Sequence, residues 1–219
     1  MSTGTDYRLH GNLMHWLMCC ALLVTSGVEA TTKEWRFRVY LDDREIGYHH
    51  FQLTESGSET RLTTRAELEV TFLKIPVFSY THENTESWNG GCLYSIASVT
   101  DENGELYQVD GGTATDGFRV TTNTGESMLP DCISTFAYWD RSFLQHSSLL
   151  NSQTGEYVDV EVDYLGERLI NTGKTTLAAH QYRLEGDDLE LELWYSQDGD
   201  WLALQSSVQG GRLLRYEIE

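Results

Sequence analysis

The sequence is poor in positive charge and in proline. Lysine and arginine together number 15 among 219 residues, against 34 aspartates and glutamates, which gives a formal net charge of −19. A field of this sign repels nucleic acid and anionic lipid headgroups at long range, so we expect no nucleic-acid partner. Pro76 and Pro130 are the two prolines, and so few strands of a predicted sheet would be interrupted.

Recognisable catalytic and cofactor motifs are also missing. The sequence has no Gly-x-Ser-x-Gly, no His-Glu-x-x-His and no glycine-rich phosphate loop that precedes a helix. Adjacent strand residues point to opposite faces, so His49 and His50 cannot join one metal site. We therefore predict no catalytic residue, no metal and no cofactor. Whether the protein is an enzyme stays open, with the negative answer favoured.

No apolar run is long enough to form a stable membrane anchor. The longest, residues 13–24, has about twelve residues, too few to cross ~30 Å of hydrocarbon at ~1.5 Å per residue. It follows the basic Arg8 and precedes Val28-Glu29-Ala30, a pattern typical of a secretory signal peptide. We predict a signal peptide over residues 1–30, a mature chain over 31–219, and a periplasmic or secreted location.

Cysteine is scarce after the predicted cleavage site. Two of the four cysteines lie in the predicted signal peptide, which leaves Cys92 and Cys132. In an oxidising compartment a disulfide between them would close a loop of about forty residues. The alternative is two buried free thiols, since cysteine packs well as a small hydrophobe. The sequence leaves both open because it does not show whether the two Cβ atoms come within reach.

Apolar residues alternate with polar ones along much of the chain. One example runs through Trp35, Phe37 and Val39, and another through Leu191 and Leu193. Turn signals rich in glycine, asparagine and aspartate separate these runs at hairpin spacing. The pattern predicts a mainly β fold over 31–219, a single domain built as an antiparallel meander. Because twist accumulates in a large sheet, we expect it to curl into a half-barrel or a barrel.

One segment breaks this alternation. Apolar side chains there recur at spacings of three and four, a helical period. They are Ile133, Phe136, Ala137, Phe143 and Leu144. With Ser134 available as an N-cap, the spacing predicts a short helix from Ser134 to about Ser147 that covers one open side of the sheet.

Aromatic residues among the polar positions suggest a lined cavity. A concave sheet face that carries such side chains suits a small-molecule site. The candidate ligand-binding residues are Tyr48, Tyr80, His82, Trp139 and Trp194. The alternative is ordinary cross-strand aromatic pairing, and for Trp139 a packing role in the predicted helix.

Several stretches of the sequence resemble one protein family. The opening at residues 37–47, Phe-Arg-Val-Tyr-Leu-Asp-Asp-Arg-Glu-Ile-Gly, resembles the Val-x-Leu-Asp-Gly-x-x-Ile-Gly start of an exported proteobacterial family, domain of unknown function family 6134. Asp43 stands where that family usually has a turn glycine. Similar stretches continue to the end of the chain, at 101–104, 135–140, 149–155 and 193–201.

The resemblance implies no established activity. A related exported family is similar to periplasmic lipoprotein carriers, whose curved sheets hold acyl chains, which implies a hydrophobic ligand by fold analogy. Our first hypothesis is therefore a periplasmic binding or carrier domain for a hydrophobic small molecule or lipid. The second is an envelope protein-interaction or assembly factor with a protein partner, and a hydrolase comes third.

Overall fold

The structure is a computed structural model that describes residues 1–4, 30–172 and 175–219. Apart from residues 1–4 and Ala30, the predicted signal peptide lies outside the described residues, so it stays a prediction. No helix in the described ranges is long and apolar enough to cross a membrane.

Strands make up most of the described chain. Two short 3-10 helices, η1 (Arg141–Gln145) and η2 (Gln209–Gly211), accompany them. The strands are β1 (Thr31–Leu41), β2 (Arg44–Ser56), β3 (Glu59–Phe72), β4 (Ile75–Asn89), β5 (Cys92–Glu102), β6 (Glu105–Ala114), β7 (Gly117–Thr122), β8 (Gly125–Leu129), β9 (Ser148–Leu150), β10 (Tyr157–Asp159), β11 (Glu161–Asn171), β12 (Thr176–Gly186), β13 (Leu189–Tyr195), β14 (Trp201–Val208) and β15 (Arg212–Ile218).

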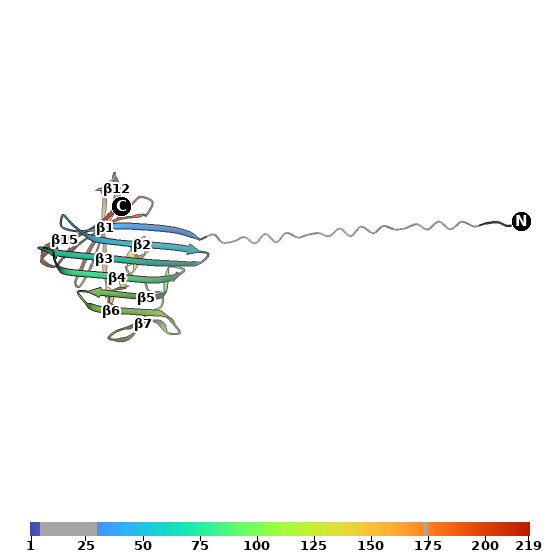
Figure 1. Cartoon of the computed structure of the whole chain (residues 1–219), viewed down its shortest axis with the longest axis horizontal. Coiled ribbons are helices and arrows are strands. Elements are labelled where there is room, and N and C mark those ends of the chain that lie inside the picture. The colour runs from blue at the N-terminus through green and yellow to red at the C-terminus, as the bar shows by residue number, and fades with distance from the viewer. Residues whose placement is uncertain (5–29, 173–174) are drawn as a thin grey trace.

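Thirteen of these strands form one antiparallel sheet, in the order β11-β12-β13-β14-β15-β1-β2-β3-β4-β5-β6-β7-β8. Each half is a meander of sequential hairpins, and the two halves join where β1 pairs with β15, for example Phe37 with Ile218. Figure 1 shows β1 to β7 side by side across one face, with the second half of the sheet curling behind them. Since β8 and β11 remain edges, the sheet is an open half-barrel. The predicted antiparallel meander is confirmed, in its half-barrel form.

Alternation along the strands builds the core on the inner face of this sheet. In β1, Trp35, Phe37 and Val39 are all at most 2% exposed, while the residues between them face outward. Arg36 and Arg38 lie on that outer face. Burying each large apolar side chain contributes ~1.5–3 kcal/mol, so the inner face supplies most of the stability.

The connection from β8 to β11, residues 130–160, returns across the inner face, and we call it the inner segment. Its buried side chains pack against the sheet. They are Ile133, Ala137, Phe143, Leu149, Leu150 and Val160. The prediction that this region covers the sheet holds, but the predicted helix over 134–147 is wrong, because helical structure within it is limited to the five residues of η1.

Hydrogen bonds to neighbouring strands explain why the inner segment is not helical. Leu93 N–H donates to Ile133 O at 3.0 Å, and Leu150 N–H donates to Ser134 O at 2.9 Å. These carbonyls are therefore used by strands rather than by a following helical turn. The N-cap is Asp140 and not Ser134, since the Asp140 carboxylate accepts from Ser142 N–H.

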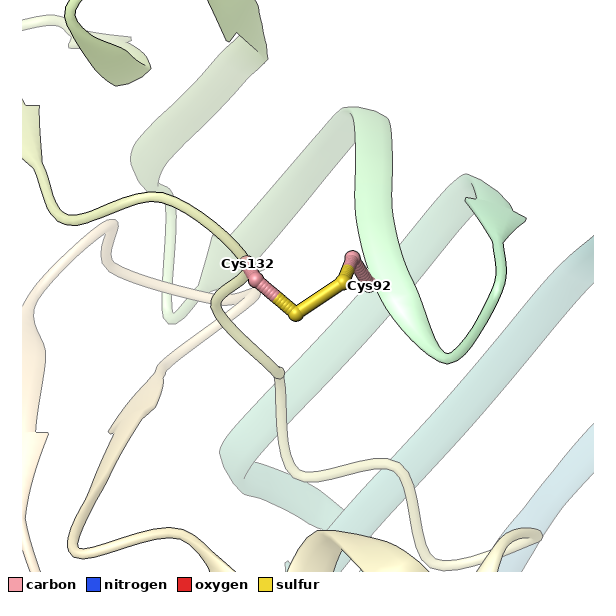
Figure 2. The surroundings of a disulfide bond; sticks show 2 residues. All are labelled: Cys92 and Cys132. Carbon is pink, nitrogen blue, oxygen red and sulfur yellow. A yellow bond between two sulfur atoms is a disulfide. The ribbon is translucent and has the colours of Figure 1, made fainter.

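A disulfide joins Cys92 to Cys132, with their Cα atoms 4.6 Å apart. Figure 2 shows that it links the start of β5 to the inner segment. The alternative of two free thiols is thereby excluded in this structure. The bridge fixes the inner segment over the sheet at its first turn, beside the backbone hydrogen bond from Leu93 to Ile133.

Candidate functional site

A cavity of about 130 Å³ lies between the inner face of the sheet and the inner segment. Its floor comes from β2, β3 and β4 and its roof from the inner segment. The polar side chains of the floor are His49, Thr64, His82, Asn84 and Glu86. The apolar and aromatic side chains around them are Phe51, Leu62, Phe136, Tyr138, Val158 and Leu189. The loop over them consists of Asn151, Ser152 and Gln153. A polar strip is thus flanked by apolar side chains and covered by a polar loop.

Strand register brings two histidines together. His49 of β2 pairs with Ala66 of β3, and Ala66 pairs with His82 of β4. The two imidazole rings meet edge to face with centroids 6.4 Å apart. His50, next to His49 in the sequence, lies on the outer face, where its ring packs on Tyr48. The inward partner of His82 is His49.

His82 is held as a neutral imidazole. It is 3% exposed, and burial lowers its pKa from 6.5 to about 4. Its Nδ1 lies 2.8 Å from Thr100 Oγ1, which in turn donates to Gln153 O at 3.4 Å. Thr100 thus connects the His82 ring to the loop of the inner segment above it.

His49 is neutral for the same reason. Burial lowers its pKa well below the usual range, and the nearby His82 and His50 add to the effect. Its Nδ1 lies 3.3 Å from Tyr216 Oη, and its ring stacks on Phe51. The other ring nitrogen, Nε2, is buried without a hydrogen-bond partner in the described chain.

Glu86 carries a carboxyl group in the same strip. It is 2% exposed and accepts from Asn84 Nδ2 at 2.9 Å, Trp88 Nε1 at 3.0 Å and Thr135 Oγ1 at 3.3 Å. Burial raises its pKa, although these three hydrogen bonds act in the opposite direction. Glu86 is not among the candidate ligand-binding residues named from the sequence. The sequence pattern that could have identified it is the alternation along β4, which places it on the same inner face as His82, Asn84 and Trp88.

Three polar atoms of the cavity floor have no partner within the described residues: His49 Nε2, Thr64 Oγ1 and Asn84 Oδ1. An unpaired buried polar group costs ~1–3 kcal/mol, so native proteins keep few of them. All three belong to side chains that line one small cavity. The arrangement thus places buried, unpaired polar atoms on side chains that line the cavity, beside apolar side chains.

The candidate residues named from the sequence divide between the two sheet faces. Tyr80 and His82 share the inner face, with ring centroids 6.3 Å apart. Tyr48 lies on the outer face, where its hydroxyl donates to Glu67 at 3.0 Å. Trp194 is also outward, between the inward Leu193 and Tyr195. The structure therefore brings two of the five together.

Trp139 lies elsewhere, in an open groove that it lines with Trp35 and Arg141. Its ring meets that of Trp88 edge to face at 5.6 Å, and its indole Nε1 has no partner in the described chain. Trp88 connects this contact to the cavity, because its own Nε1 donates to Glu86.

The buried histidines predict a stability that depends on pH. The pKa of His82 is lowered from 6.5 to about 4, so its protonation opposes folding. Its contribution to the free energy of unfolding is fully present above pH 6.5 and is lost as the pH falls through 4. The shift corresponds to roughly 3 kcal/mol. Glu86 acts in the opposite sense, because its raised pKa makes protonation favour the folded state as the pH falls.

Urea denaturation over this pH range measures the effect. His82→Asn, which keeps a polar group near Thr100, is expected to flatten the fall in unfolding free energy, whereas the outward His50→Asn is expected to leave it as in the wild type. An unchanged pH profile in His82→Asn would contradict the assignment.

Comparison with known proteins gives a family and a fold. A family model described as a domain of unknown function, DUF6134, matches residues 37–219. No curated protein matches the chain. Among solved structures it is similar to a beta-barrel-like protein of the domain of unknown function DUF1849 from Brucella abortus, with a TM-score of 0.63 and 11% identity over 85% of this chain and 94% of that one. At this identity the likeness shows a common curled sheet.

Proposed function

Since the chain belongs to the DUF6134 family of domains of unknown function, its role has to be inferred from its geometry, and we propose that it binds a small amphipathic molecule inside the half-barrel. The observation that carries the proposal is the set of three unpartnered polar atoms on the cavity floor. A ligand that offers a hydroxyl, amide or carbonyl group would pair with them. Its apolar body would contact Phe51, Leu62 and Phe136.

Cavity size limits the ligand. A dry cavity of ~150 Å³ accepts benzene, so about 130 Å³ suits a molecule of similar size or the end of a longer one. The inner segment packs against much of the inner face, and the cavity left beside it has no room for a whole acyl chain unless the segment is displaced. The proposal therefore refines the carrier hypothesis towards a compact ligand with a polar end.

A periplasmic or secreted location belongs to the same proposal. The disulfide supports it, because such bonds persist in oxidising compartments. The predicted signal peptide, from the composition of residues 1–30, supports it independently.

Native mass spectrometry of protein purified from its own host, followed by solvent extraction, tests the binding proposal. We expect a copurifying small molecule at close to one per chain. Thr64→Val removes one cavity hydroxyl with little change in shape and is expected to reduce occupancy about tenfold, the loss of one hydrogen bond to a ligand.

The adjacent Thr63→Val is the matched control, because Thr63 and Thr64 point to opposite faces of β3. Its occupancy is expected to equal that of the wild type. A well-folded wild-type sample with no copurifying molecule would overturn the proposal, as would equal losses in the two valine variants.

A further inference from the structure

The tip of the β3–β4 hairpin concentrates exposed apolar side chains. Phe72 is 67% exposed, Leu73 79%, Ile75 65% and Val77 58%. Other large exposed hydrophobics in the described chain, such as Tyr94, are spread over several strands. Single exposed apolar residues are ordinary on protein surfaces, but a contiguous group of this kind marks a contact site.

The hairpin tip also projects beyond its neighbours. Pairing of β4 with β5 ends at Tyr80 and Glu102, and the turn after β5 binds the hairpin at Ser79 through both Asn103 N–H and Asn103 Oδ1. On the other side, Arg44 donates to Thr71. On the β5 side, about five residues lead from Ser79 to the turn, roughly 15–20 Å at ~3.3 Å per residue. On the β2 side, Phe72 and Leu73 extend beyond the contact of Arg44 with Thr71.

The turn at the tip is not built from ordinary turn residues. Leu73 has φ 50° and Lys74 has φ 68°, both in the left-handed region that Gly, Asn and Asp adopt at lower cost. Asn or Gly would form this turn more easily and would remove its apolar and cationic side chains. Such strain is concentrated at functional positions.

We propose that the hairpin tip inserts into the surface of a lipid bilayer, as a peripheral contact that is separate from the ligand cavity. Four side chains at a hairpin tip are far fewer than the ~20–30 residues that each partner contributes to a stable protein interface. A bilayer requires no shape complementarity, because fluid lipid adapts to whatever apolar side chains enter it.

The local charge fits this occupant. Lys74 lies at the tip between Leu73 and Ile75, whereas the acidic residues of the hairpin nearest to it, Glu69 and Glu67, lie towards its base. Long cationic side chains extend towards phosphates while their stems cover apolar surface. A second apolar cluster, with Leu41, Ile46 and Leu68 among its members, lies under the hairpin and continues towards its tip through Val70 and Phe78.

Flotation of the purified protein with phosphatidylcholine vesicles tests this proposal. We expect the wild type to float with the vesicles and Leu73→Asp to lose at least tenfold in bound fraction. Aspartate tolerates the left-handed conformation at this position, so the fold is retained. Leu169→Asp is the matched control, because Leu169 is 77% exposed on β11 and lies outside the hairpin. Its binding is expected to be unchanged.

A second measurement locates the contact. Leu73→Trp is expected to show a blue shift of its fluorescence on adding vesicles and quenching by brominated phosphatidylcholine. Absence of wild-type flotation, or equal losses in Leu73→Asp and Leu169→Asp, would overturn the proposal. So would a wild-type dimer in sedimentation velocity that Leu73→Asp dissociates, since the occupant would then be a second copy. Thr64→Val is expected to float normally, which separates this result from ligand binding.

Discussion

Replacement of Gly47 by alanine is expected to lower the free energy of unfolding by at least about 4 kcal/mol, a size that single substitutions seldom reach. Gly47 has φ 149°, and a Cβ atom there would lie 1.9 Å from Glu67 O of the neighbouring strand. The clash is with backbone, so β2 and β3 would have to separate beside the two-histidine site. Urea denaturation monitored by circular dichroism measures the loss, or shows that the variant fails to fold.

Gly125→Ala is the control for this prediction. Gly125 has nearly the same backbone angle, φ 154°, but nothing lies within 4 Å of the position of its Cβ. Its substitution therefore reports backbone strain without the clash, ~1–3 kcal/mol. Equal losses for the two alanine variants would show that strain alone, and not the approach of Glu67, makes glycine necessary at position 47.

Removal of the disulfide is the second large effect. Cys92→Ser combined with Cys132→Ser is expected to lower the free energy of unfolding by about 4 kcal/mol, since the bridge closes a loop with a sequence separation of 40 in the unfolded chain. Denaturation of the variant and of the wild type with and without reductant measures it. The variant should not respond to reductant, whereas the wild type should approach the variant when reduced.

The location of the bridge adds a local consequence. Because it ties the inner segment to β5, its loss should speed hydrogen exchange at Leu93 N–H, which bonds across the segment boundary, and at Leu150 N–H, which bonds within the segment. Unchanged exchange at both amides would show that packing of the inner segment is sufficient without the bond.

Much of the sheet could be predicted because each strand carries its own burial pattern. Along β1, the buried Trp35, Phe37 and Val39 alternate with more exposed residues. This period of two can be read from the strand itself without knowing the rest of the chain. The sequence did not show whether the sheet stays open or closes, because this depends on whether its two edge strands pair with each other.

The predicted helix failed because spacing alone does not reveal long-range hydrogen bonds. Ile133, Ala137 and Phe143 are buried as expected. The backbone of their segment, however, accepts hydrogen bonds from Leu93, which is distant in sequence, and from Leu150 of β9. An irregular chain that packs one side onto a sheet can show helical spacing by chance.

The site was partly visible in the sequence. His82 and Tyr80 were identified, and Glu86 shares the inward positions of His82 on β4. His49 needed the register of three strands and the local irregularity in the pairing of β1 with β2 near Gly47. Tyr48 and Trp194 were named on the assumption that the sheet face with aromatic residues among polar positions is the concave one. The apolar face lines the concave side instead, because the inner segment needs a large buried surface to pack on.

The pairing of β1 with β15 makes the order of synthesis matter. Phe37 meets Ile218 only after some 180 intervening residues have been made, so the middle of the sheet is completed last. Until then β1 carries a bare row of backbone donors and acceptors that another chain could pair with. Such distant contacts slow folding, and a nascent molecule of this kind benefits from being shielded until its final strand arrives.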